Sequence, residues 1–204
     1  MSLRVGLTGG IGSGKTQISN RLGELGVEII DTDKIAREIV VPALPTLNRI
    51  VDHFGTDALT NTKHLDRAWL RKHVFDHPNA RVELDRITHP VIAKLTAQRL
   101  SMSQGAYCVA VIPLLIETSF KRLLDHVVVV TAPIEKRITW IMNRNQLSRS
   151  EVLKIIDSQV SDDERVAQAN ATVQNNGSLE ALLLATDKLH LDLHNLATKK
   201  SNTK

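Results

Sequence analysis

The chain has 204 residues, of which 42% are hydrophobic and 24% charged, a composition typical of a folded globular protein. Its single cysteine, Cys108, excludes an intrachain disulfide and a cysteine zinc cluster. The net charge of +4 suits an anionic ligand but is too small to indicate nucleic acid, and aromatic residues that could stack on bases make up only 3% of the chain.

The first thirty residues predict a strand, a helix and a second strand. Residues 3–8 form a short apolar run that ends in glycines, as expected of a buried strand. Ile18, Leu22 and Leu25 then recur at helical spacing, and residues 27–30 form a second apolar run. This βαβ unit predicts a parallel sheet with helices on its faces.

Helical periodicity dominates the next part of the chain. Apolar residues recur at helical spacing in several stretches, with Gly55 as a predicted helix end and Pro90 as a predicted kink. This is far more chain than a crossover between two strands needs. We therefore expect an inserted helical subdomain at about residues 33–100.

Further strands are predicted at residues 107–112, 127–131 and 171–174. The first two are near-continuous apolar runs, which is typical of strands covered on both faces. Pro133 marks the start of a helix that is expected to run to about Arg144.

Two capping boxes, at residues 148–151 and 161–164, predict helices in the charged segment between Arg144 and Arg165. Few core residues are expected in that segment. A Leu-rich helix follows the last strand, and the basic end of the chain from Lys199 is expected to fray.

Residues 9–16, GGIGSGKT, match the phosphate-loop pattern G-x-x-x-x-G-K-[ST], and they stand where it requires, after a predicted strand and before a helix. Glycines let backbone N–H groups turn toward phosphate oxygens, and the helix N-terminus adds positive charge. Lys15 would place its charge on the β- and γ-phosphates, and the Thr16 hydroxyl would ligate Mg²⁺. The motif predicts a nucleoside triphosphate and Mg²⁺ as ligands.

The motif and the elements together predict a three-layer α/β fold of the P-loop NTPase type, with a five-stranded parallel sheet flanked by helices. We expect a single domain over residues 1–204. Its parts are predicted as a core at about 1–32, 104–136 and 168–200, the helical insert at about 33–100, and a helical lid at about 137–167.

Other nucleotide-binding folds fit the sequence less well. A dinucleotide-binding G-x-G-x-x-G motif would need glycine where Lys15 or Gln17 stands. A GTPase would carry an N-K-x-D motif, which the chain lacks, and the D-x-x-G stretch at residues 52–55 lies at the end of a helical face. A helical insert and an Arg-bearing late segment instead fit a kinase of small molecules.

Two carboxylates, Asp31 and Asp33, follow the second predicted strand. Ligand groups gather at the carboxyl ends of parallel strands, so one of the two could accept a proton from an attacking hydroxyl near the γ-phosphate. The alternative is that Asp33 only caps the following helix, since Asp is a favoured N-cap residue.

Several separated motifs, spread from about Leu3 to Gly177, resemble the dephospho-CoA kinase family. In chain order they are LTGGIGSGKT at 7–16, DTD at 31–33 with IAR at 35–37, Phe54-Gly55, His89-Pro90, PLL at 113–115 with Glu117, and Gln159 ahead of NNG at 175–177. The phosphate loop is common to many families, whereas the D-x-D-x-I-A-R, His-Pro and P-L-L-x-E motifs together are specific.

The resemblance implies ATP-dependent phosphorylation of the ribose 3′-hydroxyl of dephospho-CoA, the final step of coenzyme A synthesis. It implies that Asp33 is the general base, that Lys15 acts on the ATP phosphates, and that Arg144 of the lid clamps them. The ATP phosphates would be held by Gly12, Ser13, Gly14, Lys15, Thr16 and Gln17. The acceptor would be bound at Thr8, Asp33, Arg37, His89, Leu114 and Glu117.

One departure from the family pattern concerns the lid. The family's lid helix usually carries two arginines one turn apart, whereas here Arg144 is present and Trp140 stands four residues earlier. We therefore expect phosphate neutralisation by Arg144 together with Arg137, Arg149 or Arg165.

Two other functions stay open: a kinase of another small molecule or of a nucleoside monophosphate, and a non-enzymatic P-loop nucleotide-binding protein. The sequence shows no secretion signal and no apolar run of roughly 18 residues. We therefore expect a cytoplasmic protein with no membrane partner. The resemblance implies dephospho-CoA as its small-molecule partner, and we further expect a monomer or weak homo-oligomer with no nucleic-acid partner.

Overall fold

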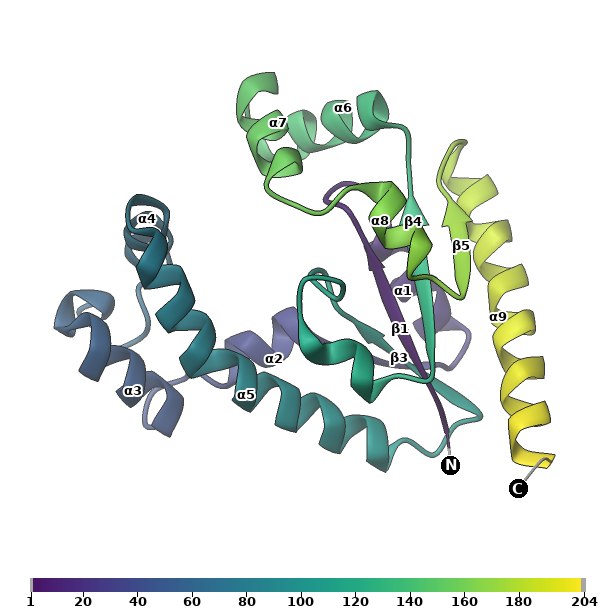
Figure 1. Cartoon of the computed structure of the whole chain (residues 1–204), viewed down its shortest axis with the longest axis horizontal. Helices are drawn as coiled ribbons and strands as arrows, with labels where there is room; N and C mark the ends of the chain where they lie inside the picture. The colour runs from purple at the N-terminus through teal and green to yellow at the C-terminus, as the bar shows by residue number, and fades with distance from the viewer. Residues whose placement is uncertain (1, 203–204) are drawn as a thin grey trace. The chain divides into compact units, whose positions relative to one another are not determined.

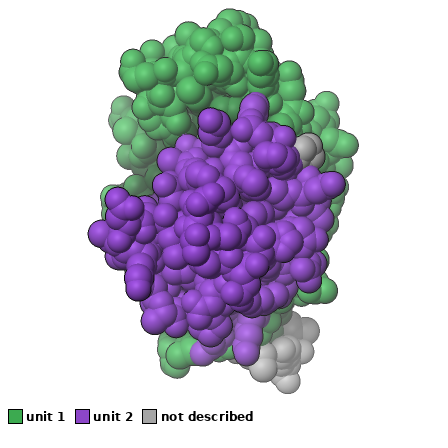
Figure 2. Space-filling model, turned by 90° about the vertical axis from the view of Figure 1, so that its left-hand side faces the viewer, with its two compact units in different colours: residues 1–30, 99–204 green, residues 31–98 purple. Residues whose placement is uncertain are grey.

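The computed structural model describes residues 2–202. The chain divides into two compact units, Met1–Ile30 with Arg99–Lys204 and Asp31–Gln98, which Figure 2 colours separately. The second unit is formed by much of the segment that the sequence predicts to be helical.

A five-stranded parallel sheet forms the centre of the first unit, in the strand order β2-β3-β1-β4-β5 (Figure 1). The strands are β1 (Leu3–Gly9), β2 (Glu28–Asp31), β3 (Tyr107–Val111), β4 (His126–Thr131) and β5 (Ala171–Gln174). Leu7 of the central strand β1 lies opposite Val111 in β3 and Val128 in β4. The predicted α/β class and five-stranded parallel sheet are confirmed.

Two helices, α1 (Lys15–Glu24) and α9 (Leu179–Asn202), cover one face of this sheet (Figure 1). Alternate residues of β1 point to them, because side chains of a strand alternate between its faces. On the other face Gly6 makes room for two leucines: a Cβ there would lie 2.4 Å from Leu124 Cδ1 and 3.1 Å from Leu115 Cδ2. The sheet is therefore buried on both faces, as the continuous apolar runs predict.

The second unit is helical. Its elements are α2 (Thr32–Glu38), α3 (Pro45–Phe54), the 3-10 turn η1 (Thr56–Ala58), α4 (Arg67–Asp76) and most of α5 (Pro78–Met102). Helix α3 ends at Gly55, whose φ of 84° favours glycine, so the D-x-x-G stretch is a helix end as predicted. Helix α5 continues through Pro90.

The predicted lid segment contains α6 (Ile134–Asn145), α7 (Arg149–Asp157) and α8 (Asp162–Ala167), and both predicted capping boxes are present. Between Arg144 and Arg165 few core residues are expected, and Val152 and Arg165 are the described residues of that stretch that are buried. Ile138, Ile141 and Val152 are at most 1% exposed and form a small apolar core of their own. Arg165 of α8 is also buried, with 1% of its surface exposed.

The chain's C-terminal end also differs from expectation. Helix α9 continues through Lys199 and Lys200 to Asn202, where fraying was expected. The Lys200 ammonium lies 2.7 Å from Asp125 Oδ1, just before β4, and this ion pair holds the last turns of the helix. Residues 203–204 lie outside the described residues.

Candidate functional site

The phosphate-loop motif forms a tight glycine turn between β1 and α1. Gly12 and Gly14 have φ values of 75° and 101°, a region that residues with a side chain rarely adopt. Gly14 is the N-cap of α1, and a Cβ at that position would lie 2.6 Å from Asn175 Nδ2. The same Asn175 amide donates a hydrogen bond to the Ser13 carbonyl at 3.0 Å, so the turn after β5 supports the loop.

The Lys15 side chain folds back over the loop that precedes it. Its Nζ donates to the carbonyl oxygens of Gly9 at 2.6 Å and Gly10 at 3.0 Å. These two partners are neutral acceptors. Anionic phosphate oxygens are stronger partners for the ammonium group.

The loop and the first turn of α1 suit a phosphate and a hard cation. The first turn carries no acidic residue that would repel an anion. Within the described residues, the buried Ser13 hydroxyl has no hydrogen-bond partner. Thr16 and Gln17 are exposed at the start of α1, and a hydroxyl oxygen such as that of Thr16 is a ligand type that Mg²⁺ accepts.

The tip of the loop is attached to the predicted lid segment. The Ile11 N–H donates to Gln159 Oε1 at 3.0 Å, and its carbonyl accepts from Arg137 Nε at 2.8 Å. Asp162 pairs with Arg137 at 3.0 Å and with Arg165 at 2.9 Å. A carboxylate between two buried guanidinium groups thus connects α6 and α8 to the phosphate loop.

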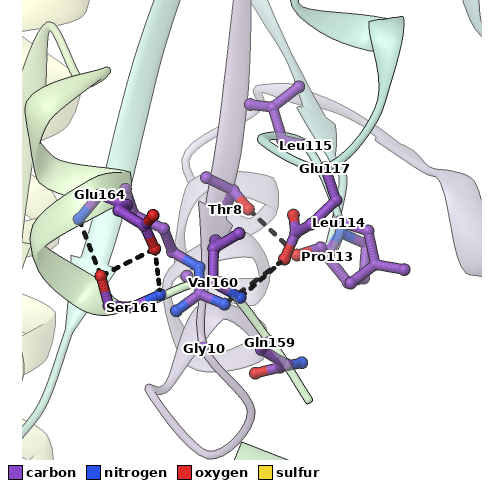
Figure 3. A network of polar contacts seen from close by, with 12 residues as sticks. Thr8, Gly10, Pro113, Leu114, Leu115, Glu117, Gln159, Val160, Ser161 and Glu164 are labelled. Atoms are coloured by element: carbon purple, nitrogen blue, oxygen red, sulfur yellow. Dashed lines mark hydrogen bonds and ion pairs between the residues drawn. The ribbon is translucent and has the colours of Figure 1, made fainter. Parts of the chain in front are cut away.

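Three residues predicted at the acceptor pocket lie near the carboxyl ends of β1 and β3 (Figure 3). Thr8 is 0% exposed, and its hydroxyl donates to the Pro113 carbonyl at 3.3 Å. This hydrogen bond links the end of β1 to the turn after β3. Leu114 is half-buried in the following turn. Glu117 points back at the core, with its Oε1 3.5 Å from the Val160 nitrogen and 3.7 Å from Arg165 Nη2.

The other predicted acceptor residues belong to the helical unit. Asp31, and not Asp33, caps α2: its carboxylate accepts from the N–H groups of Asp33 at 2.8 Å and Lys34 at 3.3 Å. Asp33 and Arg37 are exposed one turn apart on α2. His89 lies on α5, with Nε2 3.3 Å from an Asp85 carboxylate oxygen.

The lid arginines differ in their surroundings. Arg144 is exposed near the end of α6, and its Nε donates to Asn145 at 2.7 Å. Arg149 is paired with Glu135 through two hydrogen bonds, and this pairing lowers the pKa of Glu135. Arg144 is thus the more accessible candidate clamp.

Trp140 lines a cavity of about 380 Å³ together with Glu135, Lys136, Thr139 and Gly177. Lys136 Nζ donates to the Asn176 carbonyl beside it. The cavity lies between α6 and the turn after β5, whose Asn175 supports the phosphate loop.

Sequence reasoning assigned no specific contact to several residues that the structure places at the loop. Gln159 and Asn175 entered only as parts of the family pattern, and Asp162 only as part of a capping box. Each acts through a contact with a residue more than twenty positions away, and no sequence spacing reveals such contacts.

The described residues contain no group of three or more His, Cys, Asp and Glu side chains that could hold a metal ion. No described helix is both long and apolar enough to cross a membrane.

A parallel sheet with a glycine-rich loop between its central strand and a helix defines a P-loop nucleotide-binding protein. Comparison with known proteins narrows this class. Residues 3–181 match the model of the family described as "CoaE: Dephospho-CoA kinase". The chain belongs to the dephospho-CoA kinase family.

Individual relatives agree with the family match. A dephospho-CoA kinase of Syntrophotalea carbinolica is 42% identical over 181 residues, covering 87% of this chain and 86% of the relative. The structure of a dephospho-CoA kinase from Campylobacter jejuni superposes with a TM-score of 0.72 at 28% identity, covering 96% of this chain and 98% of that one. The TT1252 structure from Thermus thermophilus gives a TM-score of 0.80 at 31% identity, covering 94% and 97%.

Proposed function

We propose that this protein transfers the γ-phosphate of ATP to the ribose 3′-hydroxyl of dephospho-CoA, giving coenzyme A and ADP. The observation that carries the proposal is the phosphate loop with its Lys15 ammonium, in a chain that belongs to the dephospho-CoA kinase family along most of its length. Phosphoryl transfer needs positioning and charge neutralisation more than covalent chemistry, and a preformed loop supplies both.

Within this reaction, residues 12–17 hold the ATP phosphates through backbone N–H groups and the end of α1. Lys15 exchanges its carbonyl partners for β- and γ-phosphate oxygens. Mg²⁺, held in part by Thr16, neutralises the charge that builds up on the phosphates. Arg144 adds a cationic contact from the lid.

Asp33 is proposed as the general base that accepts the proton of the attacking hydroxyl. Its carboxylate is not the cap of α2, because Asp31 fills that place. Arg37, one turn along the same helix, carries the charge that an anionic acceptor requires. His89, Leu114 and Glu117 complete the proposed acceptor residues, with Thr8 bracing the turn after β3.

An acceptor panel tests the reaction. The protein is incubated with ATP labelled at the γ-phosphate, Mg²⁺, and dephospho-CoA, AMP or shikimate. We expect label on dephospho-CoA alone. Label on AMP or shikimate instead supports another small-molecule kinase, and ATP binding without any transfer supports a nucleotide-binding protein. The elution volume in gel filtration at several protein concentrations tests the expected monomer or weak homo-oligomer.

Substitution of the proposed base gives a second test. In Asp33→Asn we expect kcat to fall by about 10²- to 10⁴-fold, the usual contribution of a general base, with ATP affinity retained. Asp66→Asn is the matched control, since Asn also caps α4 well and the charge change is the same. A near wild-type kcat in Asp33→Asn would show that the base is another group.

A further inference from the structure

Ile11, at the tip of the phosphate loop, is held by the lid segment through its backbone and its side chain. The Ile11 N–H donates to the Gln159 side-chain oxygen, and the Ile11 carbonyl accepts from Arg137. The side chain packs against the apolar core of the lid segment, formed by Ile138, Ile141 and Val152. The tip of the phosphate loop thus packs against helices α6 and α7 of the lid segment.

Arg137 is the centre of this attachment. Arg137 is 4% exposed, and its guanidinium lies close to the backbone of Gly10. A Cβ added at Gly10 would lie 2.2 Å from Arg137 Nη2. One edge of the group donates to Ile11 and another to Asp162 at 3.0 Å. Burial lowers the pKa of Arg137, and the Asp162 carboxylate opposes this effect.

A buried cation is costly, and packed apolar residues of similar volume often stabilise a fold as well or better. A role in positioning gives a reason for an arginine at this place. The peptide unit is planar and trans, so the carbonyl of Ile11 and the N–H of Gly12 point in opposite directions. An arginine that fixes the Ile11 carbonyl on one side therefore directs the Gly12 N–H to the other.

We propose that Arg137, anchored by Asp162, is a positioning residue of the phosphate loop: it holds the Ile11 carbonyl on the lid side so that the Gly12 N–H is directed at the bound phosphates. The inference rests on the proposed function, because it assumes that the loop binds ATP.

Phosphate-specific binding tests this role. Calorimetry compares tripolyphosphate, ATP and adenosine on the wild type and on Arg137→Gln. We expect affinity for tripolyphosphate and ATP to fall about tenfold, as for loss of one charge-assisted hydrogen bond, while adenosine affinity is retained. A role in folding alone would lower the unfolding temperature and leave the tripolyphosphate affinity of the folded protein unchanged, which would overturn the proposal.

Two further variants sharpen the result. Arg21→Gln is the control. It removes another arginine–aspartate pair, Arg21 with Asp187 at 2.7 Å, away from the loop, and we expect wild-type tripolyphosphate affinity.

Asp162→Asn keeps the contact between Arg137 and Ile11 but removes the charge that anchors Arg137, so it reports on the same role if Arg137→Gln does not fold. It should weaken tripolyphosphate binding severalfold, and wild-type affinity in this variant would refute the anchoring by Asp162.

The proposed function fails in a different way. If the wild type binds neither ATP nor tripolyphosphate, the assignment of residues 9–16 as a phosphate-binding loop is wrong. If the wild type binds both and phosphorylates dephospho-CoA, but Arg137→Gln binds tripolyphosphate equally well, only the positioning role is wrong.

Discussion

Gly14 joins the phosphate loop to α1 in a conformation that few other residues adopt. Its φ is 101°, and an added Cβ would lie 2.6 Å from the Asn175 amide nitrogen that supports Ser13. Both the backbone strain and the displaced amide would disturb the loop.

We therefore expect Gly14→Ala to lower the unfolding free energy by about 1–3 kcal/mol and to weaken ATP binding. Gly23→Ala is the matched control. Gly23 lies within α1 with its ideal Cβ 3.7 Å from the nearest side-chain atom, so alanine should stabilise the helix by roughly 0.5–1 kcal/mol. Urea denaturation and calorimetry measure both effects. Equal behaviour of the two variants would argue against the strained turn.

The proposed role of Lys15, binding the ATP phosphates, can be tested by substitution. Its part-buried ammonium lies on the Gly9 and Gly10 carbonyls, and hydrogen bonds to these two neutral acceptors add only modest stability. In Lys15→Met we expect ATP affinity to fall by about tenfold or more, as for losing a charged contact, with little change in unfolding temperature. A large loss of stability with unchanged ATP affinity would assign the lysine to the fold instead.

At the residue scale, the sequence could predict what a local pattern carries. The motif at 9–16 predicted the loop and its lysine, because its turn depends only on neighbouring residues. The sequence did not decide whether Asp33, just after β2, only caps the following helix. Backbone geometry decides this, because only Asp31 has the extended conformation of an N-cap.

Helices α7 and α8 of the lid segment each begin with a capping box. Ser161 and Glu164 exchange hydrogen bonds at the start of α8, and Ser148 and Glu151 do the same for α7. These bonds lower the pKa of both glutamates in the folded protein. A lowered folded pKa adds stability above the ordinary Glu value of about 4.3, and the added stability is lost as pH falls through the folded pKa.

We expect Ser161→Ala to cost about 1 kcal/mol of unfolding free energy at pH 7 and less near pH 3, where Glu164 is protonated in both proteins. Ser158→Ala is the control, because that hydroxyl donates to the Ile155 carbonyl and contacts no carboxylate in the described structure. Its effect should not vary with pH. Denaturation curves at several pH values measure the difference, and a constant effect of Ser161→Ala would contradict the role of Glu164.

At the element scale, periodicity predicted the strands and most helices, but it did not predict that α6 and α7 share an apolar core. Ile138 and Ile141 lie on α6, and Val152 lies on α7. Their burial follows from packing against each other and Ile11.

The whole molecule depends on α9 to cover the sheet. Leu193 is 2% exposed in the core that α9 shares with α1, whereas Leu191, two positions earlier, is 62% exposed. We expect Leu193→Ala to lower the unfolding free energy by about 2–5 kcal/mol through loss of burial and formation of a cavity. Leu191→Ala should change it by about 0.5 kcal/mol or less. Chemical denaturation separates them, and equal losses would refute the assigned core face.

The sequence by itself determined the strands, the phosphate loop and the family, because each rests on neighbouring residues or on short motifs at fixed positions. Only the tertiary structure decided that Arg137 and Arg165 are buried around Asp162, that Asn175 and Gln159 support the loop, and that the chain's end stays helical beside Asp125. The physical reason is that a buried charge needs a compensating partner, and for Arg137 that partner, Asp162, lies 25 positions away, where local sequence carries no record of it.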